Sequence, residues 1–234
     1  MLHELDVSFV ERDLNALLHR IGHQCASNPV DIASIVVPST KLTNAASKHA
    51  KDLLDDAVFN HSVRTYYISQ MLRKDHFQRW KVEDETLYVT ALMHDIALAD
   101  SVQLNSQVSF EFQGGLIGRE LVLNNGGSEQ IANQVFEAIC KHEGMPHKGH
   151  QSVLDACLEF STTLDVLGQV PDTLWAQKQI DDLVTKLPRL GFNNRFAECM
   201  EREVKLKPTC FASTYITPTV LYLIRNNKIY SKYD

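Results

Sequence analysis

The stretch from Ala91 to Leu98 constrains the fold of this chain more than any other part of the sequence. It is an apolar run that is interrupted by one ionisable pair, His94-Asp95. An ionised carboxylate is rarely buried unless it is paired or bound to a metal, because removing it from water is very costly. The pair therefore lies either at a helix end in water or beside a cationic partner.

Composition places the chain among ordinary globular proteins. Its 234 residues suffice for one large domain or two small ones, and it is 44% hydrophobic and 22% charged. The net charge of -6 and the lack of a Lys/Arg cluster argue against a nucleic-acid partner. No apolar run approaches the roughly 18 residues of a membrane span, and the first residues lack the features of a signal peptide. We therefore expect no membrane partner.

The five cysteines are odd in number, widely spaced and without a Cys-x-x-Cys pair. They predict neither a zinc ribbon nor a disulfide framework. Free thiols in a reducing compartment are the simplest interpretation, so we expect a cytoplasmic protein.

Helical periodicity dominates the chain. After a capping box at Ser8 and Glu11 that would open a first helix, we expect helices over about 43–56, 60–75, 82–98, 109–124, 128–142, 151–167, 175–187, 193–205 and from 217 onward. Asn60 is the expected cap of the second of these. Residues 32–37 read as an extended segment without a partner strand. We predict a single all-α domain, built as a helical bundle.

Two local features add detail to this picture. Gly114-Gly115 would permit close helix packing or the close approach of a ligand, and Gly168 is the expected C-cap of its helix. The last helix carries a run of apolar side chains, Val220, Leu221, Leu223 and Ile224. This face would either mediate formation of a homo-oligomer or pack back onto the bundle.

Ionisable side chains fall on the expected buried faces of four helices. They are His61, the pair His94-Asp95, His142 and Asp165. Taken singly, a buried histidine is usually hydrogen-bonded to a carbonyl, and an aspartate usually lies at a helix end. Imidazole and carboxylate together are the ligands that Zn²⁺, Fe²⁺ and Mn²⁺ prefer, and a helical bundle can bring such side chains together.

A lone histidine, a His-Asp pair and a distal aspartate, in this order, resemble the HD-domain metalloenzyme superfamily. The matching segments are 60–64, 91–98 and 160–168. The resemblance implies an HD domain in which His61, His94, Asp95 and Asp165 bind one divalent transition metal. We expect Zn²⁺, with Fe²⁺ and Mn²⁺ as alternatives.

Three further segments, 109–115, 137–143 and 187–192, are similar to the fungal cyanamide-hydratase branch of that superfamily. The likeness spans about residues 42–208 and implies one HD-type domain over 1–234, with a lead-in at 1–41 and a C-terminal helix within 209–234. The chain departs from the branch in two places. It has Leu164 where the branch has a tyrosine, and it lacks the Cys-His-rich stretch that the branch carries after Lys207-Pro208.

The narrower resemblance implies a hydratase. A metal-bound hydroxide would add to the nitrile carbon of a small molecule, converting cyanamide to urea, while His142 or Glu111 carries the proton. Each of these two residues also has a structural interpretation. His142 would orient a metal ligand, and Glu111 would stabilise the first turn of a helix.

Phosphate-ester hydrolysis, for example of a nucleotide, is the alternative activity that the wider superfamily implies. It would use a second metal bound by His142 with His147 or His150, and cationic partners for the phosphate such as Arg64 and Lys141. A domain that binds metal only for stability or regulation is the remaining alternative. In both enzyme interpretations the expected partner is a small-molecule substrate.

Overall fold

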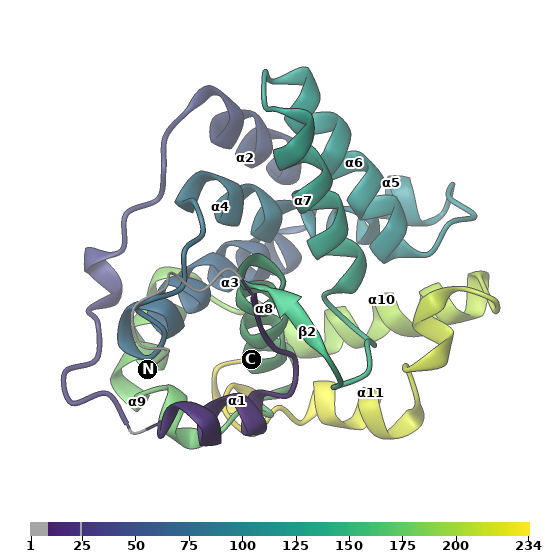
Figure 1. The fold of residues 1–234 in the computed structure, drawn as a ribbon. Coiled ribbons are helices and arrows are strands. Elements are labelled where there is room, and N and C mark those ends of the chain that lie inside the picture. The colour runs from purple at the N-terminus through teal and green to yellow at the C-terminus, as the bar shows by residue number, and fades with distance from the viewer. Residues whose placement is uncertain (1–8, 24) are drawn as a thin grey trace.

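The computed structural model of the protein describes residues 9–23 and 25–234, and over these residues the fold is helical. This confirms the predicted all-α class. The helices are α1 Leu14–Ile21, α2 Lys41–Leu53, α3 Asp56–Asp75, α4 Asp84–Met93, α5 Asp100–Gln103, α6 Phe110–Asn124, α7 Glu129–Lys141, α8 Val153–Thr162, α9 Gln177–Lys186, α10 Phe192–Leu206 and α11 Pro218–Arg225 (Figure 1). None of the helices described is both long enough and apolar enough to span a membrane.

Helix α3 runs through the middle of the molecule (Figure 1) and is buried on every side from His61 to Leu72. It contacts α2, α4, α8 and α10. A helix buried all round must satisfy its polar side chains internally. Ser62, Thr65 and Ser69 do so by donating hydrogen bonds to backbone carbonyls four residues earlier.

Helices α6 and α7 form a closely packed pair (Figure 1). A Cβ atom on Gly115 would lie only 2.9 Å from the Cys140 sulfur on α7, and one on Gly114 would lie 3.1 Å from the backbone oxygen of His94. The two glycines therefore allow close helix packing, as predicted. Gly114 also lets α6 approach the backbone that carries the His-Asp pair.

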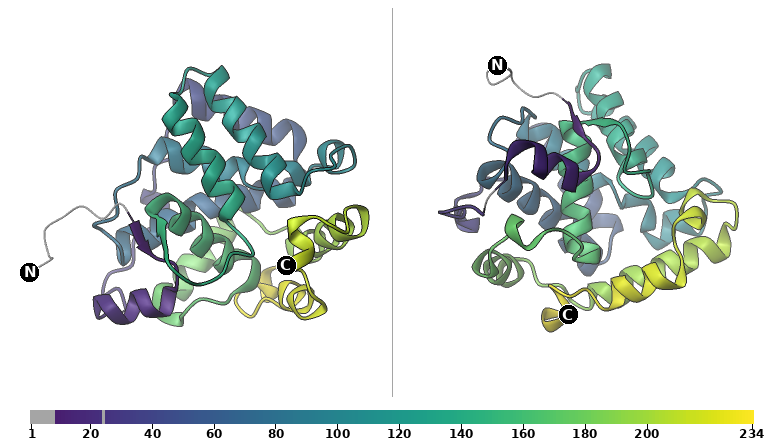
Figure 2. Two further views of the ribbon diagram at one scale, coloured as in Figure 1. Left: turned by 45° about the vertical axis from the view of Figure 1, so that its right-hand side comes forward. Right: turned by 60° about the horizontal axis from the view of Figure 1, so that its bottom comes forward.

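Helices α10 and α11 lie side by side along one edge of the molecule (Figure 2). The apolar face of α11 buries Ile224, and Val220 and Leu221 pack against the same hydrophobic cluster. Thr217 caps this helix and Pro218 occupies its first position, as predicted. Much of the face therefore packs onto the bundle, and a homo-oligomer stays a prediction.

A two-stranded antiparallel ribbon joins the N-terminal segment to the middle of the chain. Strand β1 Phe9–Glu11 pairs with β2 His150–Ser152. Beside it, the Arg12 guanidinium lies 3.1 Å from the carboxylate of Glu159, and this ion pair is buried. The sequence analysis missed the ribbon because three-residue strands are too short to show a periodicity of two.

The start of the first helix was predicted wrongly. The expected capping box does not form: Glu11 belongs to β1, and Ser8 lies outside the described residues. Helix α1 begins at Leu14, where the carboxylate of Asp13 accepts a hydrogen bond from the Ala16 amide. An aspartate one position before the helix provides an equally good cap.

Two other boundaries differ from the prediction. Asp55 caps α3 through the amides of Ala57 and Val58, so Asn60 lies inside the helix and donates instead to the Pro188 carbonyl at 2.9 Å. Residues 32–34 form a 3-10 turn in the segment predicted to be extended.

Candidate metal centre

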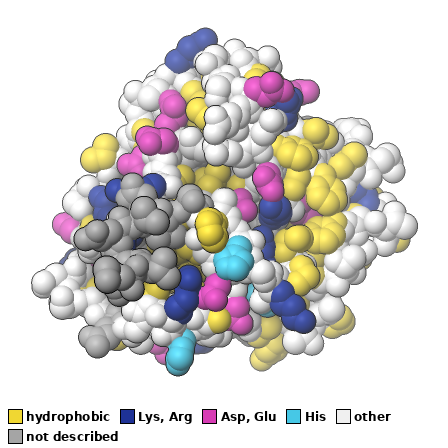
Figure 3. Space-filling model, viewed as in Figure 1, with side chains coloured by type: hydrophobic (Ala, Val, Ile, Leu, Met, Phe, Trp, Pro, Cys, Tyr) yellow, Lys and Arg dark blue, Asp and Glu magenta, His cyan; other side chains and the backbone are white. Residues whose placement is uncertain are grey.

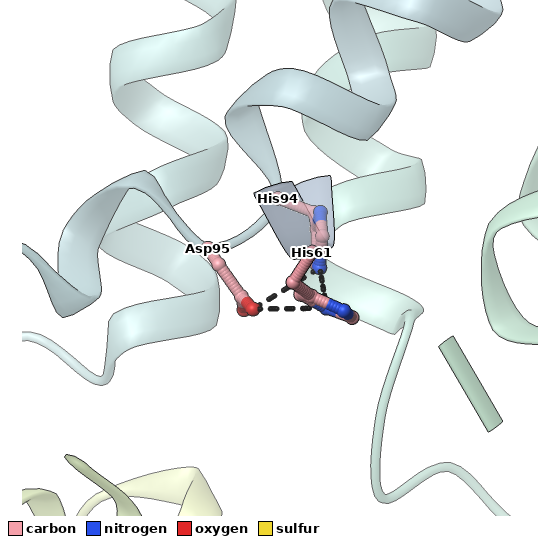
Figure 4. Close-up of side chains that lie close together, drawn as sticks. All are labelled: His61, His94 and Asp95. Carbon is pink, nitrogen blue, oxygen red and sulfur yellow. Dashed lines mark hydrogen bonds and ion pairs between the residues drawn. The ribbon is translucent and has the colours of Figure 1, made fainter. Parts of the chain in front are cut away.

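Three potential ligand atoms converge where α3 meets the end of α4 (Figure 4). His61 lies on α3, and His94 and Asp95 directly follow the last residue of α4. The Nε2 atom of His61 is 3.1 Å from Nε2 of His94 and 3.4 Å from Oδ2 of Asp95, and the His94 Nε2 is 3.2 Å from that oxygen. All three side chains are buried. Among the described residues this is the one cluster with metal-ligand geometry.

The hydrogen bonds of the two imidazole rings direct their lone pairs toward the centre of the cluster. His94 Nδ1 lies 2.7 Å from the Ala91 carbonyl, and His61 Nδ1 lies 2.7 Å from Oδ2 of Asp165. Because a carbonyl or carboxylate oxygen accepts hydrogen bonds, Nδ1 carries the proton and Nε2 is left with a lone pair. Two lone pairs and a carboxylate then face one another, an arrangement that needs a cation or an added proton.

Asp95 supplies the negative charge of the cluster. Both of its oxygens are buried, and neither accepts a hydrogen bond of good geometry from the described residues. Burial opposes ionisation, but His94 and His61 outweigh it when their rings carry the added proton, and they hold the pKa of Asp95 well below its usual range. Conversely, Asp95 raises the pKa of His94 despite its burial. A buried carboxylate without hydrogen bonds beside two imidazoles fits a divalent transition metal, which would compete with a proton for the nitrogens.

Asp165 lies on the far side of His61 from this cluster. Its carboxylate accepts from His61 Nδ1, from the Arg64 guanidinium at 2.8 Å and from that of Arg189 at 3.0 Å. All four side chains are almost completely buried. Burial opposes ionisation of Asp165, but the two arginines outweigh it and hold its pKa well below the usual range. In this arrangement Asp165 orients the ring of His61, and its expected role as a metal ligand stays a prediction.

The backbone around Asp165 is also distinctive. Helix α8 passes into a π-helical turn, Thr163–Leu167, which ends at Gly168 with the left-handed φ of 63°. Gly168 is thus the C-cap, as predicted. The buried Asn227 donates to the Asp165 carbonyl at 3.0 Å, and Arg189 donates to the same oxygen at 3.2 Å. Single π-helical turns often occur at functional sites.

His142 lies next to the cluster at the C-terminal end of α7. Its Nδ1 donates to the Ile139 carbonyl at 2.6 Å, and its Nε2 is 3.8 Å from Oδ1 of Asp95. Burial and the neighbouring His94 lower the pKa of His142 to about 4. The ring is therefore neutral at pH 7, with a lone pair on Nε2 that faces the cluster.

Glu111 is buried in the first turn of α6. One of its carboxylate oxygens accepts from the Tyr215 hydroxyl at 2.5 Å, and the other accepts from the Ser109 hydroxyl. Burial raises the pKa of Glu111. Its carboxyl can therefore carry a proton closer to neutral pH than an exposed glutamate does.

Two hollows adjoin this region. An outer groove of about 530 Å³ is lined by His142, Glu143 and Tyr215, among others, and by residues at the start of α1. An inner apolar cavity of about 20 Å³, room for about one water molecule, shares Glu143 and Tyr215 with the groove and is also lined by Phe196. The ring of Phe196 lies 5.9 Å from that of His61. Glu143 and Tyr215 thus stand where the groove and the cavity meet.

The residues proposed for a second metal lie farther out. His150 is an exposed residue of β2, and His147 is exposed on the wall of the outer groove. Lys141 pairs with Glu137, and its ammonium is 3.8 Å from Asp155.

The outer face that includes β2 carries acidic and basic side chains interspersed, with hydrophobic side chains gathered toward one side (Figure 3).

A model of the HD domain matches residues 58–176. This match contains His61, the His94-Asp95 pair and Asp165. The chain belongs to the HD-domain family. Two curated relatives, cyanamide hydratase DDI2 and cyanamide hydratase DDI3 of Saccharomyces cerevisiae, are each 33% identical to it over 177 residues, which is 75% of this chain and 78% of theirs.

Membership of this family, together with the His61–His94–Asp95 cluster, identifies the chain as a metal-dependent enzyme of the HD type. The predicted resemblance, both to the superfamily and to its cyanamide-hydratase branch, is confirmed by these two comparisons.

Several side chains around the HD centre carried no functional signal in the sequence analysis. Arg189 lies in a segment that was recognised for its likeness to the branch, but its ion pair with Asp165 joins residues 24 positions apart. Tyr215 and Asn227 reach the site from the C-terminal part of the chain. Their isolated polar side chains match no spacing rule, so only the packing of the helices shows what they do.

Proposed function

We propose that this HD domain is a hydratase that adds water to a small neutral nitrile-type substrate, converting cyanamide or a related molecule to the corresponding urea or amide. The relatives named cyanamide hydratase support this proposal. The main structural support for the proposal is that the two arginines beside the centre are already bound to another residue. Arg64 and Arg189 are buried and hydrogen-bonded to Asp165, so neither guanidinium is available to hold a phosphate group.

The walls of the two hollows also favour a neutral substrate. Glu143 lines both of them, and the rest of the inner cavity is largely apolar. In the outer groove, Arg12 is paired with Glu159. Asp13 and Glu159 also line the outer groove. A phosphate ester would therefore bring its negative charge beside these carboxylates without a matching free arginine from these walls, whereas an uncharged nitrile would meet no such repulsion.

His61, His94 and Asp95 would hold the metal, with Asp165 as the predicted fourth ligand. The bound metal supplies a Lewis acid that makes water a better nucleophile, and we expect Zn²⁺. Asp165 keeps the proton on Nδ1 of His61 and so keeps Nε2 directed toward the cluster.

His142 would accept a proton from water near the centre. Its neutral ring presents the Nε2 lone pair beside Asp95 and also lines the outer groove, so it can pass that proton to solvent. Glu111 would supply the proton that the substrate nitrogen needs.

A product assay tests the proposal. Purified enzyme is incubated with cyanamide and small nitriles in one arm and with nucleotides and other phosphate esters in the other. We expect urea or amide in the first arm and no phosphate in the second. His94→Ala, which removes a ligand atom from the cluster, is expected to abolish activity and metal content together. Release of phosphate without nitrile hydration would replace the proposal with the phosphohydrolase alternative.

A further inference from the structure

We propose that Tyr215 is a catalytic residue that relays a proton from the buried carboxyl of Glu111 to the substrate. This role rests on the hydratase function proposed above, and it concerns a residue outside the segments that carry the family resemblance.

The first argument is that Glu111 needs an intermediary. Its side chain is completely buried, and it is absent from the described walls of both hollows. Its carboxylate has two hydrogen-bonding hydroxyl partners, Ser109 and Tyr215. The Ser109 oxygen also accepts from the Phe211 amide at 3.1 Å, which places that hydroxyl among backbone groups. Of these two partners, Tyr215 is the residue that also lines the groove and the cavity.

The second argument is that Tyr215 is held firmly where the groove and the cavity meet. Tyr215 lines both hollows. The ring also packs over Gly144, where a Cβ atom would overlap it. Its hydroxyl donates to Glu111 at 2.5 Å, a short hydrogen bond that suits proton transfer. The ring is held by its packing over Gly144 and the hydroxyl by its hydrogen bond to Glu111, so the Tyr215 side chain is held in a single orientation.

The charges around the pair suit a relay. Burial raises the pKa of Glu111, and the nearby Glu203 raises it further, although Glu203 also pairs with Lys207 at 3.0 Å. Burial and the negative charge of Glu111 raise the pKa of Tyr215 far above that of a free tyrosine, and Glu143 and Asp95 act in the same direction. Because burial alone raises its pKa, the tyrosine stays neutral whether Glu111 is ionised or protonated, and Glu111 is the group that takes up and releases the proton. The Cys140 thiol, which faces the Glu111 backbone, also stays neutral, because burial raises its pKa to about 12.

The proton balance closes with water alone. The oxygen of water forms a bond to the nitrile carbon as one C–N π bond breaks. In the structure Tyr215 donates to the Glu111 carboxylate. Once Glu111 has taken up a proton, the Tyr215 hydroxyl accepts from that carboxyl instead, so it gives its own proton to the nitrile nitrogen and takes the Glu111 proton in the same movement. The proton lost by the attacking water returns through the groove and then through the Tyr215 hydroxyl to Glu111. The resulting isourea then shifts its hydroxyl proton to nitrogen and becomes urea.

Tyr215→Phe removes the hydroxyl and keeps the ring over Gly144. We expect kcat to fall by about 100-fold or more, the range for loss of a general acid, with little change in KM, metal content or melting temperature. In the wild-type enzyme, part of the change of kcat with pH should come from titration of Glu111, and this part should be absent from the pH profile of the variant. Glu111→Gln should have a similar effect, and the double variant should be no worse than either single one. Tyr222→Phe, at an exposed tyrosine of α11, is the matched control.

A second measurement does not depend on substrate. Infrared spectroscopy follows the exchange of the Glu111 carboxyl proton for deuterium after transfer to D₂O, with Glu111→Gln to assign the band. We expect slower exchange in Tyr215→Phe than in the wild-type protein, because the route to the groove is broken. Unchanged exchange together with unchanged kcat would overturn the relay. An enzyme that hydrates no nitrile, yet shows the slower exchange, would refute the hydratase proposal and leave the proton path from Glu111 in place.

Discussion

Asp165 shows how individual residues shape this centre. Its carboxylate lies among two guanidinium groups and one imidazole, all without access to water. Desolvation of such a group is expensive, and excellent geometry with several hydrogen bonds is needed to offset it. The two arginines meet that requirement, so the carboxylate stays ionised and can keep the His61 ring in one tautomer. The negative charge therefore acts on the metal site without being exposed to the groove.

His142 should make stability depend on pH. Its pKa is about 4 in the folded protein, against 6.5 for an ordinary histidine. Between these values the unfolded chain binds a proton that the folded protein does not, so the free energy of unfolding falls as pH falls from 6.5 to 4. At 1.4 kcal/mol per pH unit, the loss over this range amounts to at most about 3.5 kcal/mol.

The measurement is urea unfolding of the wild-type protein and of His142→Gln between pH 4 and pH 7. The stability advantage of wild type over the variant should shrink as pH falls. Glu143 contributes with the opposite sign, because burial raises its pKa to about 8, but it is present in both proteins and cancels in the difference. His19→Gln, at an exposed histidine, controls for the substitution itself. A wild-type advantage that is constant across this range would contradict the buried, neutral state of His142.

At the scale of elements, the helices themselves were predictable and their ends were less so. Ser128 caps α7 and Gly168 ends the π-helical turn, as predicted. Both were predictable because a capping serine hydroxyl and a glycine at positive φ depend only on neighbouring residues of the chain. The start of α3 was misplaced because Asp55 and Asn60 are both good caps and only tertiary packing chooses between them. Helix α4 was expected to run to Leu98 but ends at Met93, so the His-Asp pair follows it.

Gly168 offers a test of how the π-helical turn is held. Its φ of 63° disfavours any residue with a Cβ, and a Cβ there would lie 2.5 Å from the side-chain oxygen of Asn227. That oxygen accepts from the amides of Ile229 and Tyr230, so it cannot move freely. We expect Gly168→Ala to lower the free energy of unfolding by about 1–2 kcal/mol for the backbone and by about 1–3 kcal/mol more for the overlap.

Gly191→Ala separates the two contributions. Gly191 also has a positive φ, of 75°, but a Cβ there would meet nothing within 4 Å. Chemical denaturation should therefore show a smaller loss for Gly191→Ala than for Gly168→Ala. Equal losses would mean that the contact with Asn227 contributes nothing to stability.

At the scale of the molecule, the site is assembled from distant parts of the chain. The ordered set of histidines and aspartates was enough to recognise the family. The surroundings of the metal were not predictable in the same way, because Arg189, Tyr215 and Asn227 reach it from segments between 24 and 104 residues away from their partners. Such contacts depend on how α10, α11 and the C-terminal end fold back over the bundle (Figure 2), and no local pattern encodes that path.

Metal binding should stabilise the molecule as a whole, because the cluster joins α3 to the segment that follows α4. Two imidazole lone pairs and an ionised carboxylate repel one another until a cation binds, so the folded state should bind metal far better than the unfolded chain. At a free metal concentration of 100 times Kd, binding adds about 2.7 kcal/mol to the free energy of unfolding. For a chain of this size that raises the melting temperature by about 5–10 °C.

Calorimetry of the chelator-treated protein, with and without added Zn²⁺, measures this rise. His94→Ala should melt at one temperature under both conditions, since it lacks one of the converging nitrogens. If the wild-type protein melts at the same temperature with and without Zn²⁺, then His61, His94 and Asp95 form a structural hydrogen-bonding cluster, with a proton in place of the cation.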